Sequence, residues 1–274
     1  MSQPVGLANV GNTCFLNAAR QVFASLFPEQ AAGLGVLEEP GRWADWWESR
    51  GGCRRGQQDD AQAVLSALLE LSAEAGAACE FRVARSFECA ACARAAVLHR
   101  AVERFLILAL PPTGRGRAGR VPFVDLVADW AAADPLVETG ERCAGCGGRL
   151  GRGRPFLAQA PPAVWLVHVQ RYTAASAKRD EAVDWPLRWN DRAWAPAAFE
   201  LAAGLLHHGG SAHSGHYTAV VRAGASWWHC NDSVVTRLPD DRTALDLLAG
   251  AYVVAFQRVA GRVGQLGDRP VAAI

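Results

Sequence analysis

The chain has 274 residues, of which half are hydrophobic and a fifth are charged, and 28 basic against 27 acidic side chains give a formal net charge of +1. This balance is ordinary for one large globular domain or two small ones. A near-neutral chain carries no overall field toward nucleic acid or anionic membranes. Its longest apolar runs, such as Phe105 to Leu110, fall far short of the roughly 20 residues that span a bilayer. We therefore expect neither nucleic acid nor a membrane as a partner.

A stretch rich in glycine and asparagine leads into a cysteine at the start of the first predicted helix. Turn-forming residues fill Gly6 to Asn12, just before Cys14. From Phe15 onward, apolar residues recur at the spacing i, i+3, i+4 and i+7 of a half-buried helix, which Pro28 ends. Cys14 should lie in the first turn, where free N–H groups and the helix dipole favour a thiolate. This pattern indicates a nucleophile; the alternative is a buried structural cysteine.

A second amphipathic helix is predicted within Gln57 to Leu71. Asp59 and Asp60 stand at its start, where a capping side chain and first-turn acids are favoured. Between the two helices, three tryptophans at positions 43 to 47 are expected on a loop, where they fill an edge of the core.

After Cys79 the pattern changes to short strands. Strands are predicted at Phe81 to Val83, Arg104 to Leu108 and Pro161 to Tyr172. The Gly/Arg stretches 114–120 and 147–154 are expected to be exposed loops. Residues 199–258 are predicted to form strands separated by Gly and Asp turns, and the tail after Arg258 is expected to be loose.

Two C-x-x-C pairs predict a metal site. They are Cys89 with Cys92, and Cys143 with Cys146. Four thiolates from two such turns form the closed tetrahedral set that structural zinc prefers, and they leave no open position for catalysis. A single C-x-x-C could instead be a redox pair, but two of them without a βαβ pattern argue against that. The other four cysteines resemble single thiols, which fits a reducing compartment.

The last third supplies partners for the cysteine. His216 follows Gly215 at a predicted loop-to-strand junction, and Asn231 and Asp232 end the next strand. An antiparallel pair of that length could set Asn231 or Asp232 against His216. A cysteine nucleophile, a histidine base and an Asn or Asp that orients it form the papain-type arrangement. The histidines that precede this motif are expected to be exposed loop residues: His207, His208 and His213.

Taken together, these motifs resemble those of the ubiquitin-specific proteases, the zinc-fingered, papain-like deubiquitinases. Gly6 to Gln21 resembles the family's cysteine box, and Gly215 to Tyr217 with Trp227 to Val235 resembles its histidine box. The other matches are the Gln-x-Asp-Ala helix at 58–62, the fingers at the two C-x-x-C pairs, the core strand at 164–172 and the closing strand at 251–256. The similarity runs in family order from Gly6 to about Arg258.

The resemblance implies an α+β, papain-like fold with a helical thumb, a β palm and zinc-ribbon fingers. It implies one catalytic domain over residues 1–258, with the thumb at about 1–78, the fingers at about 79–160 and the palm at about 161–258. Residues 259–274 would then be a flexible tail.

Carried over residue by residue, the resemblance assigns Cys14 as the nucleophile and His216 as the general base. Asn231 would orient the imidazole, with Asp232 assisting, and Asn9 would donate its side-chain amide to the oxyanion. The residues implied to lie near the C-terminal tail of ubiquitin are Asp60, Tyr172, Gly215 and Tyr217. The implied cofactor is a structural Zn²⁺ on Cys89, Cys92, Cys143 and Cys146. Ala63 departs from the family, which often has a glutamate there that faces the substrate tail.

The implied activity is that of a thiol-dependent deubiquitinase, which hydrolyses the isopeptide or peptide bond after the C-terminal Gly-Gly of ubiquitin. Its partners would be ubiquitin or a ubiquitin-like protein and their conjugates. The alternatives are a protease for a ubiquitin-like modifier and a catalytically weak ubiquitin-binding relative. A zinc-ribbon nucleic-acid module would need a basic face, which the near-neutral charge disfavours. The first motif begins at Gly6, which leaves no room for a signal peptide, so we expect a cytoplasmic protein, with the nucleus as the alternative.

Overall fold

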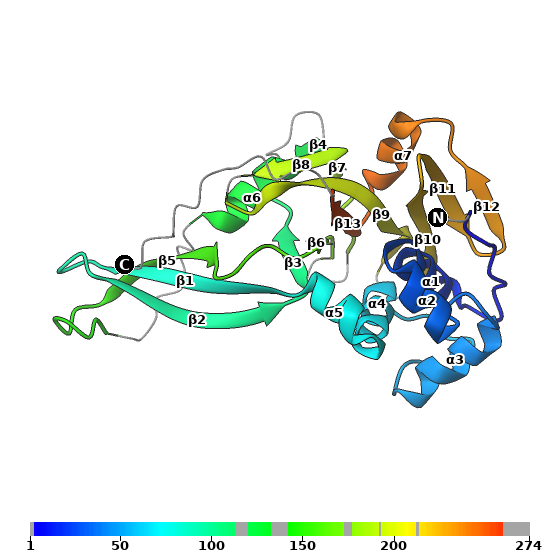
Figure 1. Cartoon of the computed structure of the whole chain (residues 1–274), viewed down its shortest axis with the longest axis horizontal. Helices are drawn as coiled ribbons and strands as arrows, with labels where there is room; N and C mark the ends of the chain where they lie inside the picture. The colour runs from blue at the N-terminus through cyan, green and yellow to red at the C-terminus, as the bar shows by residue number, and fades with distance from the viewer. Residues whose placement is uncertain are drawn as a thin grey trace.

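The N-terminal helices lie at the right-hand end of an elongated molecule, beside part of its larger sheet, and a narrow set of strands projects to the left (Figure 1). The computed structural model describes residues 3–112, 120–132, 142–172, 177–191, 193–211 and 214–259. The N-terminal helices are α1 (Cys14–Leu26), α2 (Pro28–Leu34), α3 (Pro40–Ser49), α4 (Ala61–Leu71) and α5 (Ala73–Cys79).

A long three-stranded sheet projects away from the helices, to the left in Figure 1. Its antiparallel order is β2-β1-β5, with β1 (Phe81–Cys89), β2 (Ala95–Glu103) and β5 (Leu150–Leu157). The turn between β1 and β2 forms its tip, together with the segment that precedes β5. This sheet therefore carries both C-x-x-C pairs away from the helical end.

A second, larger sheet extends from the middle of the molecule to its right-hand end (Figure 1). Its path is β12-β11-β10-β9-β13-β6-β3, with β8 paired to β9, and of these pairings only β3 with β6 is parallel among the described residues. The strands are β3 (Phe105–Ala109), β6 (Val164–Gln170), β8 (Arg188–Asp191), β9 (Ala195–Ser211), β10 (Ser214–Ala223), β11 (Ser226–Asn231), β12 (Val234–Arg237) and β13 (Val253–Arg258). The remaining elements are β4 (Arg120–Pro122), α6 (Phe123–Ala131), β7 (Ala182–Asp184) and α7 (Asp241–Leu248).

Helix α1 lies between the large sheet and the other helices, in contact with β9 and β10 on one side and with α4 and α2 on the other. The sequence predicted a half-buried helix, but most residues of α1 are buried. The polar side chains Asn17, Arg20 and Gln21 are buried along with the apolar ones. Each donates a hydrogen bond to a backbone carbonyl of a neighbouring segment, which compensates the loss of water.

The N-terminal segment reaches the site through a close backbone approach. Leu7 N donates to the carbonyl of Asp232 at 2.9 Å. A Cβ on Gly6 would lie 2.2 Å from the carbonyl oxygen of Ser233, so only glycine fits there. This contact sets the loop that precedes Cys14 against the turn between β11 and β12.

Several elements differ from their sequence-based predictions. The three tryptophans lie on α3 rather than on a loop, and the 147–154 stretch enters β5 because β1 supplies its hydrogen-bonding partner. Helix α7 interrupts the predicted run of strands in the last third. The predicted loop at 114–120 and the expected loose tail lie outside the described residues, except for Arg120 and Val259.

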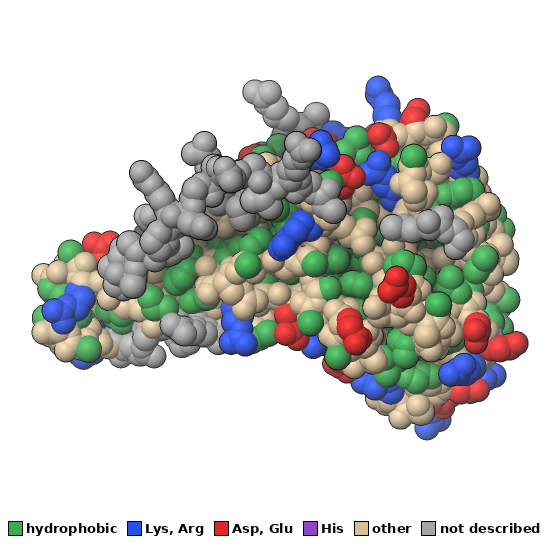
Figure 2. All heavy atoms as spheres, in the orientation of Figure 1, with side chains coloured by type: hydrophobic (Ala, Val, Ile, Leu, Met, Phe, Trp, Pro, Cys, Tyr) green, Lys and Arg blue, Asp and Glu red, His purple; other side chains and the backbone are tan. Residues whose placement is uncertain are grey.

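The predicted helix at 57–71 is confirmed as α4, and its apolar face is buried at Ala61, Val64, Leu65, Leu68 and Leu69. On the face shown in Figure 2, Lys or Arg side chains and Asp or Glu side chains are interspersed rather than separated by sign. In the described part of the chain, no helix has both the length and the apolar character needed to span a bilayer.

Candidate active site

The His216 ring is hydrogen-bonded to Asn231. His216 stands near the start of β10 and Asn231 at the end of the antiparallel strand β11. Nε2 of His216 lies 2.7 Å from Oδ1 of Asn231. An amide oxygen only accepts, so Nε2 carries the proton and Nδ1 is left as the basic nitrogen. Among the described residues the ring makes no hydrogen bond to Cys14, a separation that is common before substrate binds.

Gln58 connects Cys14 to the loop that precedes His216. Its Nε2 donates to the Gly215 carbonyl at 2.9 Å, and Gly215 N donates back to its Oε1 at 3.1 Å. The same Nε2 lies 3.8 Å from Sγ of Cys14. Gln58 was not among the predicted site residues, although its place in the Gln-x-Asp motif was a signal for it.

Cys14 begins α1 as predicted, but its thiol is not the pre-formed thiolate that a helix start favours. Its side chain is 3% exposed. Burial has the largest effect and raises the pKa of the thiol; a backbone hydrogen bond from Tyr217 lowers that pKa, and the charge of Asp232 raises it again. Desolvation therefore outweighs the backbone hydrogen bonds at the helix start and favours the neutral thiol over the thiolate.

Asp232 contacts Asn9 rather than the imidazole. Nδ2 of Asn9 donates to Oδ2 of Asp232 at 2.9 Å, while Nδ2 of Asn17 donates to Oδ1 at 2.8 Å. Oδ1 of Asn9 accepts from the backbone N–H groups of Gly11 and Thr13, at 3.2 and 3.1 Å. Oγ1 of Thr13 also donates to Oδ1 of Asn9 at 3.3 Å, so four contacts fix the exposed Asn9 amide beside the start of α1. Asn17 was missed by the sequence analysis, because only the fold brings it to Asp232.

A cleft of about 450 Å³ runs between the start of α4 and the large sheet. The residues that line it are Gln58, Asp59, Asp60, His168, Gln170, Arg171, Tyr172, His207, Tyr217 and Tyr252. Three of the four residues predicted near the substrate tail, Asp60, Tyr172 and Tyr217, are in this lining. The fourth, Gly215, is hydrogen-bonded to Gln58 at the end of the cleft nearest Cys14. The cleft therefore leads to the thiol.

Asp60 both caps helix α4 and lines the cleft. It is the N-cap of α4, with Oδ1 accepting from Gln62 N at 2.8 Å, and the same oxygen accepts from the Tyr252 hydroxyl at 3.0 Å. Burial first, and then the Asp60 charge, raises the pKa of the Tyr172 phenol, which therefore stays a neutral donor.

His207 is buried, contrary to the expectation of an exposed loop histidine. Its Nδ1 lies 2.6 Å from the Tyr172 hydroxyl, and its ring centroid lies 4.5 Å from that of Tyr217. Burial, assisted by the charge of Lys178, lowers the pKa of His207 to about 4. A Cβ on Gly215 would lie 2.3 Å from its Nε2, so the glycine before His216 admits this ring. His213 lies outside the described residues.

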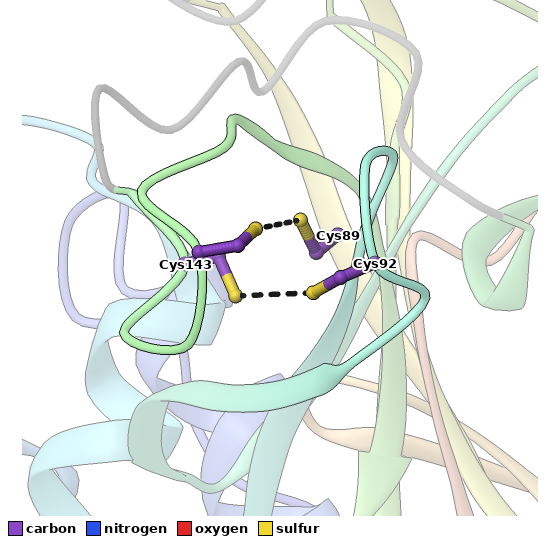
Figure 3. Close-up of side chains that lie close together, drawn as sticks. Cys89, Cys92 and Cys143 are labelled. Carbon is purple, nitrogen blue, oxygen red and sulfur yellow. Dashed lines mark hydrogen bonds between the residues drawn. The ribbon is translucent and has the colours of Figure 1, made fainter.

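The four C-x-x-C cysteines meet at the tip of the three-stranded sheet, as Figure 3 shows for Cys89, Cys92 and Cys143. All four Sγ atoms lie within 4.8 Å of one another. Cys89 to Cys146 spans 3.5 Å and Cys92 to Cys143 spans 3.7 Å. Thiolates that surround one zinc ion at about 2.3 Å lie about 3.8 Å apart, so the donor set fits a tetrahedral metal ion.

The chain matches known proteins in sequence and in structure. The family model "Ubiquitin carboxyl-terminal hydrolase" matches residues 44–256. Ubiquitin carboxyl-terminal hydrolase 21 of Homo sapiens is 28% identical over 211 residues, which cover 73% of this chain and 36% of that protein. Ubiquitin carboxyl-terminal hydrolase 3 of Homo sapiens is 30% identical over 135 residues, which cover 44% and 25%. The chain thus aligns with about a third or less of these relatives' length.

Among solved structures, the SAGA Ubp8/Sgf11/Sus1/Sgf73 DUB module bound to ubiquitin aldehyde matches with a TM-score of 0.75 at 14% identity, over 93% of this chain and 70% of that one. The same module bound to monoubiquitin, with Ubp8(C146A), also gives 0.75. The match confirms the expected mixed helix and sheet fold, with a cysteine cluster that fits zinc-ribbon fingers. The family match confirms the resemblance: the chain belongs to the ubiquitin carboxyl-terminal hydrolases, the cysteine deubiquitinases.

Proposed function

We propose that this chain hydrolyses the isopeptide or peptide bond after the C-terminal Gly-Gly of ubiquitin, with Cys14 as the nucleophile. The observation that carries the proposal is the convergence at one end of the cleft. Cys14 begins α1 there, Gln58 ties it to the loop before His216, and Asn9 is held beside it by Asp232. The cleft is lined by the carboxylates of Asp59 and Asp60 and by three tyrosines.

The chemistry follows from the protonation states. Nδ1 of His216 accepts the proton of the Cys14 thiol as Sγ attacks the carbonyl carbon of the terminal glycine. The Asn9 amide and the Cys14 backbone N–H donate to the oxyanion of the tetrahedral intermediate. The imidazolium then returns its proton to the departing lysine amine, which leaves a thioester. Water hydrolyses that thioester with His216 again as the base, and the thiol and the carboxylate of ubiquitin are released.

The cleft supports recognition of the tail by charge. The C-terminal segment of ubiquitin carries arginines before Gly-Gly, and a carboxylate aimed at a guanidinium forms a charge-assisted pair. Asp60 supplies such a carboxylate in the wall of the cleft. Tyr172 and Tyr217 add neutral phenol groups to the same wall.

The remaining assignments are part of the same proposal. The thumb would hold α1–α5, the three-stranded sheet would form the fingers, and the large sheet would form the palm, within one domain over residues 1–258. The four-cysteine cluster would hold a structural Zn²⁺. All eight cysteines are free of disulfides, which supports a reducing compartment such as the cytoplasm or the nucleus.

A ubiquitin-like modifier is the second candidate substrate, and Ala63 favours it. This residue lies on α4, three positions after Asp60, where a second substrate-facing acid would stand in the family. A panel of C-terminal reporter fusions of ubiquitin and ubiquitin-like proteins separates the candidates. Ala63→Glu should raise the activity toward ubiquitin or leave it unchanged.

The direct test is a thiol-reactive probe built on the C-terminus of ubiquitin. Labelling of the wild type with loss of labelling in Cys14→Ala is the expected result. The variant should still bind ubiquitin, because only the thiol is lost. A wild-type protein that binds ubiquitin but neither reacts with the probe nor cleaves the reporters would instead be a catalytically weak binder. Reaction of the probe with Cys53 or Cys230 in the variant would show that one of these cysteines, and not Cys14, is the nucleophile.

A further inference from the structure

Arg20 is a fully buried cation without an anionic partner. This residue of α1 is 0% exposed, and none of the ion pairs in the described ranges includes it. Burial lowers its pKa to about 10, so it remains charged at neutral pH. A buried charge without a counterion is costly unless its hydrogen bonds are made. Its contacts therefore indicate what the guanidinium does there.

Three acceptors surround the guanidinium. Nε donates to the Val36 carbonyl at 2.5 Å and Nη2 to the Glu38 carbonyl at 2.5 Å. Nη1 donates to Oδ1 of Asn17 at 3.2 Å, one turn back along α1. The Trp43 ring lies beneath the cation, 5.5 Å from Cζ to the ring centroid. Two of the acceptors are backbone carbonyls after α2, but the third is a side chain of the active-site network.

The contact with Asn17 fixes the direction of an amide. A guanidinium has no acceptor, so it must face Oδ1 of Asn17 and never Nδ2. Nδ2 thereby faces Oδ1 of Asp232 at 2.8 Å, and it also faces the carbonyls of Leu7 and Ala8 at 3.3 and 3.2 Å. The other carboxylate oxygen of Asp232 accepts from Nδ2 of Asn9 at 2.9 Å. A continuous chain of hydrogen bonds thus leads from Arg20 to Asn9.

We propose that Arg20 is a positioning residue for the oxyanion-binding amide of Asn9, acting through Asn17 and Asp232. The proposal rests on the proposed function of the site. The cation fixes the donor direction of Asn17, whose Nδ2 in turn donates to Oδ1 of Asp232. That carboxylate engages one N–H of the Asn9 amide and leaves the other for the oxyanion. The competing explanation is that Arg20 only fastens α1 to the segment that contains Val36 and Glu38.

The two explanations predict different values of kcat for an Arg20 variant. If Arg20 acts through Asn9, Arg20→Met should lower kcat by about tenfold, less than the about 10²–10³-fold loss expected when an oxyanion donor is removed. KM for a ubiquitin C-terminal reporter should stay within about twofold, because the cleft is untouched. A kcat equal to that of the wild type would overturn the proposal.

A double-mutant cycle provides the decisive measurement. In the Asn9→Ala background, Arg20→Met should cause no further fall in kcat, because the amide that it positions is gone. An equal fall in both backgrounds would show a merely structural role. Wild-type activity and the Asn9→Ala loss are measured first, so a failure of the proposed function appears before the cycle is read.

Two further variants separate a loss of stability from a loss of the proposed positioning. Trp43→Phe loosens the same segment, because Nε1 of Trp43 donates to the Gly35 carbonyl at 3.0 Å, but it leaves Asn17 untouched. It should lower the melting temperature and keep the wild-type kcat. If Arg20→Met does not fold, Arg20→Lys replaces it in the cycle, since it keeps the charge but cannot reach three acceptors. A Trp43→Phe variant with the same kcat loss as the Arg20 variant would contradict the proposal.

Discussion

The carboxylate of Asp232 is hydrogen-bonded to the amide of Asn9, 223 positions earlier in the chain, with Oδ2 and Nδ2 2.9 Å apart. The residue before it, Asn231, instead contacts Nε2 of His216 at 2.7 Å. Asp232 has φ of +49°, a left-handed conformation in which the chain turns between β11 and β12. Two adjacent residues therefore serve two different parts of the site.

This division predicts different kinetic signatures. Asn9→Ala should lower kcat by about 10²–10³-fold, roughly 2.7–4 kcal/mol, with little change in binding. Asp232→Ala should also act on kcat, and the two losses should not add, because both act on one amide. Asn231→Ala should instead alter the pH profile of kcat/KM, since it removes the acceptor that orients the base. Losses of Asn9→Ala and Asp232→Ala that add in full would contradict the assignment.

The raised pKa of Cys14 predicts how the resting thiol reacts with a small alkylating agent. A protonated thiol is a poor nucleophile, so the rate at Cys14 should climb by about tenfold per pH unit between pH 7 and 9. The sign follows from burial, which disfavours the thiolate and moves its formation to higher pH. The measurement is mass spectrometry of the Cys14 peptide after brief exposure to iodoacetamide.

His216→Ala is the matched variant for this experiment. Its pH profile should overlay that of the wild type, because Cys14 and His216 are not hydrogen-bonded in the described structure. A rate that is constant from pH 6 to 8 in the wild type, and is lost in the variant, would reveal a pre-formed thiolate–imidazolium pair instead.

Asp60 requires a substitution that separates its two contacts. Asp60→Ala removes the cap of α4, worth typically about 1 kcal/mol of stability, together with the charge. Asp60→Asn keeps an oxygen that can accept from Gln62 N and from the Tyr252 hydroxyl, and removes only the charge. It should raise KM for ubiquitin reporters by about tenfold or more, equivalent to about 1.4 kcal/mol, at an unchanged melting temperature.

Glu70→Gln is the control for charge on the same helix, because Glu70 pairs with Arg50 on the surface at 2.6 Å, outside the cleft lining. It should leave KM unchanged. If Asp60→Asn cleaves ubiquitin reporters with the wild-type KM, then the modifier is not ubiquitin or its tail lies elsewhere.

Metal analysis should find one zinc ion per chain, bound by the cluster at the end of the three-stranded sheet. Cys92→Ser or Cys146→Ser should lower the zinc content and the melting temperature, because the binding of structural zinc is coupled to folding. Cys53→Ser is the control, since Cys53 lies on the loop before α4 and outside the cluster. A metal-free protein with full stability would refute the prediction.

Local sequence patterns predicted the parts of the site that depend on neighbouring residues. The turn-rich stretch before Cys14 and the apolar spacing after it placed the cysteine at the start of α1. Asp60 before an amphipathic run predicted the N-cap of α4. Local patterns could not predict β5, because its strand conformation depends on pairing with β1. They also left His207 on an exposed loop, since its burial comes from Tyr172 and Tyr217.

Local patterns were enough to predict the groups that we propose to carry the chemistry: a cysteine at a helix start, a histidine at the start of a strand, an amide one strand later and two thiol pairs. Spacing along the chain is enough for these, because helix starts and metal-binding turns are local structures. The raised pKa of the Cys14 thiol and the hydrogen bonds that lead from Arg20 to Asn9 depend instead on the tertiary structure. Desolvation depends on what the rest of the fold places around an atom, and hydrogen bonds such as the one between Asn9 and Asp232 join residues that no local pattern connects.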